Sequence, residues 1–490
     1  MKLFLEEAKR VIKANSITAN GNEEVANYLA SLMQDRGMKV TLQPVTHSIE
    51  GYSKRQFNLI GILGDPLVDR KTRKGLLLCS HVDTSDPGLN KSWEKTGGNP
   101  FQLVQEDQRL YALGVASGKL DILAQIHAAE KFRERKLKQP IYVVGTCGGE
   151  MSLFGARYLI KSLALNPRHV MVSEPTDLKL MVEHKKQWVS RVSLGFQMVE
   201  RDARGFNRRI QLRTFGRIAH AGLPHRGDNA VVNAIEFLSG AIAHGFDLRF
   251  TEISGGSMTN LVPDQAKVEF YLTSHQLEDF KRYFREVVSS ESREESFQIE
   301  VGGTEATGIR FLPDSIFQVL EDSVAFFRGL SVGSELAAES RTVNLGALKQ
   351  GPGSLEVIFD LRLPPSDQGE QLEKVILEGI GMIASRHPQF NIRCSRERSA
   401  QPFEYSSIPG SGVLLKYAEE ALQSSELPVA HYKTMTATEA SLFAQAGYET
   451  LGIGAGPALG SVHEPNEWAM MDQFLSLSRF YEKLIEKICL

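Results

Sequence analysis

The chain has 490 residues, a formal charge of −3 at pH 7 and an apolar share of 42%, which are ordinary values for a soluble globular protein. This length is too great for one hydrophobic core, so we expect two or more domains, and the lack of a basic tract argues against a nucleic-acid partner. Four scattered cysteines and the lack of a long apolar run predict a cytoplasmic protein with no membrane partner.

The first 187 residues alternate between strand and helix patterns. The N-terminal apolar patch is interrupted by Glu6 and Glu7, which indicates an amphipathic helix and not a signal peptide. Strands are predicted at residues 38–45, 58–63, 75–80, 141–146 and 169–173, and helices at 2–14, 22–36, 121–132 and 152–161. This alternation indicates a mostly parallel sheet covered on both faces.

The pattern changes near residue 188, where amphipathic strands replace buried ones. Strands are predicted at 188–196, 209–215, 249–253 and 267–273 with helices at 229–242 and 277–287, and a similar set follows, with helices at 314–327 and 368–385 and strands at 342–349, 355–363 and 390–394. From residue 402 the first pattern resumes, with helices at 412–422, 439–446 and 470–489 and a strand at 450–453.

These changes predict an α/β fold in which one domain is discontinuous. Residues 1–187 and 402–490 would form a mostly parallel-sheet domain. Residues 188–401 would form an inserted α+β lid domain that is partly doubled, with halves at about 188–302 and 303–401.

Predicted strand ends of the discontinuous domain carry side chains that can bind a metal. His81 and Asp83 follow the strand at 75–80, Glu150 and Glu174 follow the next two strands, and His463 lies in a C-terminal loop. Imidazole and carboxylate donors suit zinc, and open α/β sheets bind ligands at the carboxyl ends of their strands. Each residue alone also fits an ordinary turn, but their recurrence at equivalent places favours a site.

Five motifs resemble those of a known family. In chain order they are HVDTSDPG, SEPTDLKLMVEHK, GRIAHAGLPHRGDNAVVNA, GGSMTNLVPDQA and GIGAGPALGSVHEPNEW. The chain resembles the zinc amidohydrolases and exopeptidases that include acetylornithine deacetylase, succinyl-diaminopimelate desuccinylase, carboxypeptidase G and aminoacyl-histidine dipeptidase. The long lid most resembles the dipeptidase branch, in which an extra half-lid stands in for a dimer partner, so the resemblance favours a monomer over a homodimer.

The resemblance also implies roles for single residues. One metal would be held by His81 and Glu174 and a second by Glu150 and His463, while Asp83 would orient His81.

In the lid, the resemblance implies that His220 helps to stabilise the tetrahedral oxyanion. Asn260 and Arg362 would contact the substrate or its carboxylate. The loops that carry His220 and Asn260 also fit ordinary turns, since Asn and Gly favour turns.

Two positions depart from the family pattern. Ser117 stands where the family has an aspartate that bridges two metals, and Gly149 stands where it has the general-base glutamate. A hydroxyl replaces a shared carboxylate poorly, so we expect at most one zinc ion, bound weakly or not at all. Loss of a general base removes about 10²–10⁴-fold in rate. Asp86 and Asp121 are nearby carboxylates, although helix capping is the simpler role for Asp121.

The resemblance therefore implies a metal-dependent hydrolase of peptide or N-acyl amide bonds, of dipeptidase or deacylase type, with a remodelled or mononuclear site. Its substrate would be a small peptide or an N-acyl amino acid. The alternative is a catalytically inactive family member that binds such a molecule or a protein partner.

Overall fold

The computed structural model describes residues 2–47, 49, 51–65, 73–162, 165–200, 205–290, 294–303, 309–333, 340–367, 369–401, 403–408, 410–458 and 460–490. The chain divides into two compact units, Met1–Lys185 with Ala400–Leu490, and Lys186–Ser399. Both boundaries lie two residues before those predicted from the sequence. Each unit has its own large hydrophobic core.

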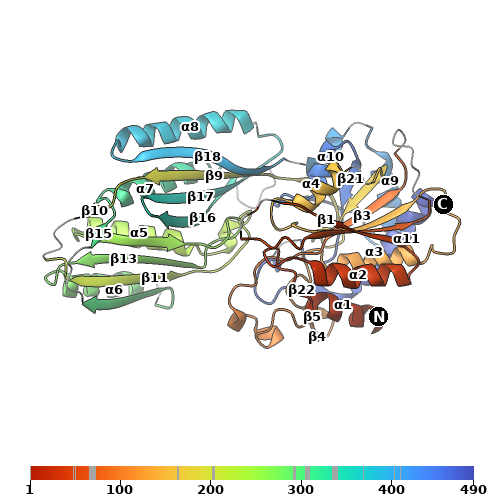
Figure 1. Ribbon diagram of the computed structural model, residues 1–490, viewed down its shortest axis with the longest axis horizontal. Coiled ribbons are helices and arrows are strands. Elements are labelled where there is room, and N and C mark those ends of the chain that lie inside the picture. Colours follow the sequence, from red (N-terminus) through yellow and green to blue (C-terminus); the bar gives the residue numbers. More distant parts are fainter. Residues whose placement is uncertain are drawn as a thin grey trace. The chain divides into compact units, whose positions relative to one another are not determined.

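The first unit is built on a mixed sheet of nine described strands (Figure 1). Their order is β1 (Lys39–Pro44), β2 (Phe57–Leu63), β6 (Ile141–Thr146), β3 (Leu76–His81), β7 (His169–Val172), β21 (Glu449–Gly452), β8 (Leu180–His184) and β19 (Phe403–Glu404), with β20 (His431–Thr434) also paired to β8. The central strands β6, β3, β7 and β21 run parallel. The predicted parallel arrangement therefore holds for the centre of the sheet. At its two sides, β1, β2, β8 and β19 form antiparallel pairs.

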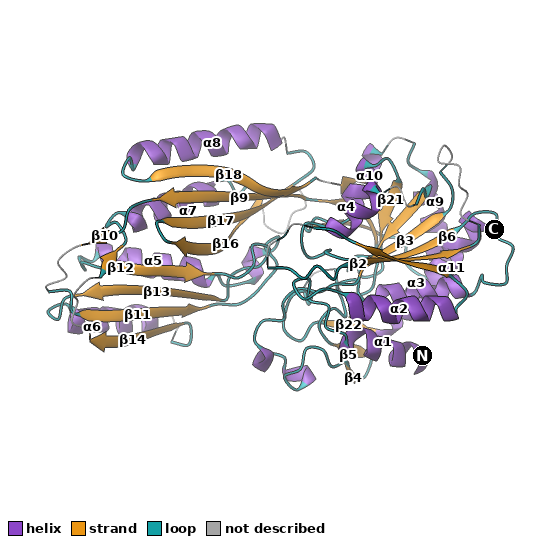
Figure 2. Ribbon diagram, in the orientation of Figure 1, coloured by secondary structure: helices purple, strands orange, loops and turns teal. Residues whose placement is uncertain are grey.

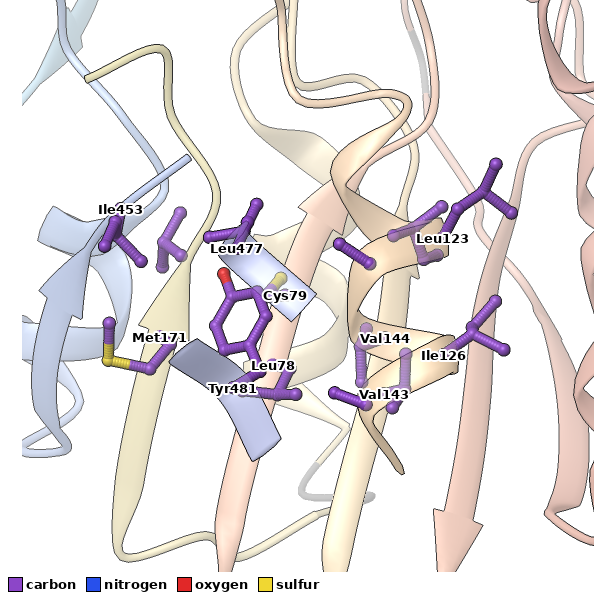
Figure 3. Close-up of a cluster of buried hydrophobic side chains, with 14 of the residues drawn as sticks. Leu78, Cys79, Leu123, Ile126, Val143, Val144, Met171, Ile453, Leu477 and Tyr481 are labelled. Atoms are coloured by element: carbon purple, nitrogen blue, oxygen red, sulfur yellow. The ribbon is translucent and has the colours of Figure 1, made fainter. Parts of the chain in front are cut away.

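Helices cover both faces of this sheet, as Figure 1 shows. They are α1 (Lys2–Lys13), α2 (Glu23–Asp35), α3 (Asp121–Glu130), α4 (Phe154–Lys161), α9 (Val413–Ser424), α10 (Ala440–Gln445) and α11 (Met471–Cys489). Helices α3 and α11 pack against β3 and against each other, while α10 packs against β7, β21 and α4. Figure 3 shows Leu123 and Ile126 of α3 and Leu477 of α11 in the core beside the central strands.

The sequence pattern explains why these central strands are buried. Leu76, Leu77, Leu78 and Cys79 of β3 are all at most 1% exposed, because parallel neighbours pair with both edges and helices cover both faces. A short three-stranded sheet of β22 (Trp468–Met470), β5 (Arg109–Tyr111) and β4 (Val104–Glu106) lies apart from the main sheet. The sequence did not predict these three short strands.

The second unit contains a sheet of eight described strands, with helices packed on it (Figure 2). The order is β14 (Phe297–Gly303), β11 (Arg208–Phe215), β13 (Gln265–Leu272), β12 (Arg249–Gly255), β16 (Thr342–Gly351), β17 (Ser354–Leu363), β9 (Lys186–Gly195) and β18 (Asn391–Ala400). Its helices are α5 (Ala230–Ala243), α6 (Leu277–Ser290), α7 (Ile316–Gly329) and α8 (Gly369–Arg386). A separate pair joins β10 (Val199–Glu200) to β15 (Arg310–Phe311).

Two structural halves of the lid sheet meet where β12 pairs with β16. Strand β9 lies within the predicted first half of the sequence, yet it pairs along its length with β17 in the second half of the sheet. The division at residue 302 therefore does not follow the order of the strands in space. No described helix has the length and apolar character needed to cross a membrane.

Candidate metal centre

The predicted ligands follow the parallel centre of the first unit. His81 is the last residue of β3, Glu150 lies in the turn after β6, and Glu174 follows β7. His463 lies in the loop that follows β21. These four strands are neighbours in the sheet and run in the same direction, so their carboxyl ends share one edge.

Glu150 and His463 form an ion pair. Glu150 Oε2 lies 3.4 Å from His463 Nε2, and the two side chains are only 8% and 9% exposed. Ser85 Oγ lies 2.8 Å from His463 Nδ1, so it fixes the other side of the ring. His463 has a φ of 64°, a conformation that a non-glycine residue adopts at a cost and that is common at functional sites.

Asp83 contacts the ring of His81. His81 Nδ1 lies 3.1 Å from the Asp83 carbonyl oxygen and 3.6 Å from Asp83 Oδ1. Burial alone would lower the pKa of His81, but Asp83, Glu150 and Glu439 raise it well above its usual value. Nδ1 is thereby occupied, which directs the second ring nitrogen away from Asp83.

Asp83 also holds the turn that carries Glu150. Its carboxylate accepts hydrogen bonds from the backbone nitrogens of Gly149 at 2.9 Å and Glu150 at 3.2 Å, and from Thr18 Oγ1 at 2.6 Å. Burial would raise the pKa of Asp83, but these bonds and His81 outweigh burial and lower it. A fully buried aspartate therefore remains ionised and connects the ends of β3 and β6.

Two other carboxyl groups in this region lack comparable compensation. Burial raises the pKa of Glu150 to about 7 and that of Glu174 to about 8. No residue in the described part of the chain donates a hydrogen bond to the Glu174 carboxylate. Glu174 is half-buried, and a carboxylate that loses water without gaining donors is costly unless a cation or a proton neutralises it.

The donor types therefore fit zinc, but the geometry is incomplete. Among the described residues, no group of three or more His, Cys, Asp or Glu side chains is arranged to hold one ion. The structure brings Glu150 and His463 together as a pair, whereas the like charges of Glu150 and Glu174 repel each other. The four-ligand arrangement thus stays a prediction.

The loop that carries Ser117 is fixed by hydrogen bonds of two buried ionisable residues, Glu467 and Lys119. Glu467 accepts hydrogen bonds from the backbone nitrogens of Gly114 at 3.0 Å and Ala116 at 2.7 Å. Lys119 is buried and donates from Nζ to the Ala14 carbonyl oxygen at 3.0 Å, and burial lowers its pKa to about 7. These contacts fix the position of Ser117, which is 5% exposed.

Neither aspartate considered as a stand-in shows a clear site role. Asp86 is exposed and accepts a hydrogen bond from Gly88 in a turn. Asp121 is 1% exposed and accepts a long hydrogen bond of 3.4 Å from the Ala455 backbone.

Glu439 is a buried carboxylate that sequence reasoning missed. It precedes α10 and is 2% exposed, and its charge acts on His81. A glutamate at a helix start is ordinarily a solvated residue that favours the helix dipole. The only sequence signal was its place in a short helix before the strand β21.

The second unit brings the two predicted lid loops together. The Ala221 backbone nitrogen donates to the Asn260 carbonyl oxygen at 2.9 Å, and His220 pairs with Leu261 in a β-bridge. His220 Nδ1 accepts a hydrogen bond from the Gly222 backbone at 2.9 Å, so its proton resides on Nε2.

Arg362 is already engaged by a carboxylate. Its Nε and Nη2 donate to Asp360 at 2.7 and 3.0 Å, and the side chains are 3% and 0% exposed. A contact between Arg362 and a substrate carboxylate would require this buried pair to open, so that predicted role remains without structural support.

Comparison with known proteins decides the family. A model of peptidase family M20/M25/M40 matches residues 77–487. The chain belongs to this family. M20-type proteins are metallopeptidases and related hydrolases, which agrees with the resemblance found in the motifs.

Individual relatives agree with this assignment. The chain is 30% identical over 256 residues to acetylornithine deacetylase of Photorhabdus laumondii, covering 51% of this chain and 56% of the relative. The chain thus spans about half the length of the curated relatives it matches.

Solved structures extend the likeness of the M20 fold to nearly the whole chain. Aminoacylhistidine dipeptidase from Vibrio alginolyticus has a TM-score of 0.55 at 16% identity, covering 99% of this chain and 96% of that chain. Human carnosine dipeptidase 1 has a TM-score of 0.58 at 14% identity, covering 99% and 97%. At these identities the likeness shows the fold alone.

Proposed function

We propose that this M20 protein is a zinc-dependent hydrolase of peptide or N-acyl amide bonds with a remodelled, mononuclear site. Its substrate is a dipeptide or an N-acyl amino acid. The single observation that carries the proposal is the buried Glu150–His463 pair, 3.4 Å apart, at the same sheet edge that carries His81 and Glu174. Glu174 is half-buried with no hydrogen-bond donor among the described residues, and a bound cation would offset the cost of that placement.

In this proposal each residue around the ion has a physical task. His81, Glu174, Glu150 and His463 are the candidate ligands. Asp83 holds His81 in one tautomer, and Ser85 does the same for His463. When bound, zinc supplies Lewis-acid polarisation of the scissile carbonyl.

In the proposal, His220 of the second unit has the role that the resemblance implies, stabilisation of the tetrahedral oxyanion. Because His220 Nδ1 accepts the Gly222 backbone proton, its Nε2–H is the donor that oxyanion stabilisation requires. Asn260, in the adjoining loop, is the companion residue in the proposal. We also propose that the protein is cytoplasmic and monomeric.

The second candidate function is a catalytically inactive binding protein. Ser117 and Gly149 favour it, since neither side chain replaces a carboxylate, and so does the lack of a three-ligand group among the described residues. The two candidates differ in whether zinc binds and in whether turnover depends on His81.

Zinc content and hydrolysis together test the proposal. The full chain is dialysed against micromolar zinc, its metal content is measured, and it is assayed on a panel of dipeptides and N-acetyl amino acids. We expect one zinc per chain and slow turnover that His81→Ala abolishes. A chain that takes up no zinc would exclude the hydrolase, and zinc uptake without turnover on any panel member would favour the binding protein.

A further inference from the structure

Glu439 is anchored on the same face of the sheet as His81. Thr146 Oγ1 donates to Glu439 Oε1 at 2.7 Å, and Cys79 Sγ donates to Oε2 at 3.5 Å. Thr146 is the register partner of His81 in the neighbouring strand, and Cys79 precedes His81 by two residues, so all three lie on one face. The Glu439 carboxylate is therefore placed beside His81 by two strands at once.

The charge of Glu439 has no conventional partner. Within the described residues no Lys or Arg forms an ion pair with it, and Thr146 and Cys79 are neutral donors. Burying a carboxylate with only neutral donors is unfavourable, so a positive centre at the adjacent strand ends is what this placement would stabilise.

The position that lost a carboxylate lies at the same end of the sheet. Ser117 takes the place of the family's bridging aspartate, in the loop that leads into α3. Gly118, its neighbour, lies close to the ring of His81, because a Cβ atom added there would be 3.7 Å from His81 Nε2. Ser117 and Glu439 therefore reach the surroundings of the same imidazole from different elements.

We propose that Glu439 supplies the negative charge that Ser117 lacks, and that it acts as a positioning residue for the zinc site through His81. This inference rests on the proposed function, since it assigns a role toward the same metal. Each oxygen of the Glu439 carboxylate accepts one hydrogen bond, and the two bonds fix its orientation. Both donors are neutral, so the negative charge can still interact with His81 and with a cation.

Zinc affinity of the metal-free full chain tests the inference without any activity measurement. Glu439→Gln removes the charge at nearly constant shape, and we expect its zinc dissociation constant to rise about 10- to 100-fold, as for other groups that support metal ligands. The matched control is Glu183→Gln, which removes the same charge from another buried glutamate of this unit, one that is paired with Lys433. We expect this control to stay within about threefold of the native chain.

Rescue separates a charge role from a structural one. If Glu439 replaces the missing aspartate, Ser117→Asp in the Glu439→Gln background should recover at least tenfold of the lost affinity. A purely structural defect at α10 would not be repaired from the Ser117 loop. Native affinity in Glu439→Gln, or no recovery in the double variant, would overturn the inference.

Two further outcomes are distinguishable. If the native chain itself binds no zinc, the proposed function fails, and the inference fails with it. If Glu439→Gln does not fold, as judged by circular dichroism, Thr146→Val removes only the hydroxyl donor to Oε1. A zinc affinity about 3- to 10-fold weaker supports the role of Glu439 in that case, and an unchanged affinity overturns it.

Discussion

A Cβ atom placed on Gly149 would lie 2.4 Å from Cγ of His81 and 2.5 Å from its Cβ. The ring of His81 therefore occupies the space that any side chain at position 149 needs. The general-base glutamate that the resemblance implies for this position would fit only if His81 first moved.

The first prediction follows from this contact. Gly149→Ala should displace His81 and lower the free energy of unfolding by about 1–3 kcal/mol, because an added methyl group has no room. Its zinc affinity should fall as well. Urea unfolding and a chelator-competition titration measure the two effects.

Gly381 offers a matched control. It lies inside helix α8, and no atom outside its own helix lies within 4 Å of an added Cβ. Gly381→Ala should leave zinc affinity unchanged and raise stability by up to about 1 kcal/mol. Equal behaviour of the two variants would show that His81 does not fill the space at Gly149 in solution.

The second prediction concerns Ser85, which contacts His463 Nδ1 at 2.8 Å. Ser85→Ala removes the group that orients the ring, so zinc affinity should fall about 10-fold or more. Ser424→Ala, on the exposed end of α9, is the control and should have no effect. An unaltered dissociation constant for Ser85→Ala would mean that His463 is not a ligand or is held by other contacts.

The third prediction is a pH dependence of stability at Glu449. Burial would raise its pKa, but His169, Tyr405 and the Leu414 backbone nitrogen outweigh burial and lower it to about 2. The unfolded chain binds this proton near pH 4.5, so the stabilisation is complete above that pH and is lost as pH falls towards about 2.

Glu449→Gln should therefore be less stable than the native chain at pH 7 by about 1–3 kcal/mol, since it weakens buried hydrogen bonds. The difference should shrink between pH 4.5 and pH 3 in urea unfolding curves. Glu404→Gln, which alters an exposed glutamate, serves as the control. A difference that stays constant with pH would contradict the low pKa.

The fourth prediction tests the buried pair in the lid. Asp360→Asn leaves the Arg362 guanidinium buried beside a neutral amide and should cost about 3–5 kcal/mol of stability. Zinc affinity should be unaffected, which separates a structural role of Arg362 from a role in the metal site. Replacing both residues, as Asp360→Leu with Arg362→Met, should recover most of the stability. An Asp360→Asn variant as stable as the native chain would show that this pair opens readily.

The sequence predicted most of the helices and strands and the positions of the candidate ligands relative to them. The three consecutive leucines before Cys79 predicted a buried strand, and β3 is one, because an apolar run can be buried only where both faces are covered. His81, Glu150 and Glu174 were placed after strands for the same local reason. Apolar runs and the polar residues that follow them depend on adjacent residues only, so they can be recognised without knowledge of the tertiary structure.

The sequence by itself determined which segments become strands and helices, where one domain interrupts the other, and that polar residues gather at the ends of buried strands. Only the tertiary structure decided that β9 joins the second half of the lid sheet, that Ser85 contacts His463 and that Glu439 accepts hydrogen bonds from Cys79 and Thr146. The physical reason is that the periodicity of apolar side chains, which indicates a helix or a strand, is a property of neighbouring residues. Ser85 and His463, in contrast, are 378 positions apart and come into contact only through the packing of whole elements.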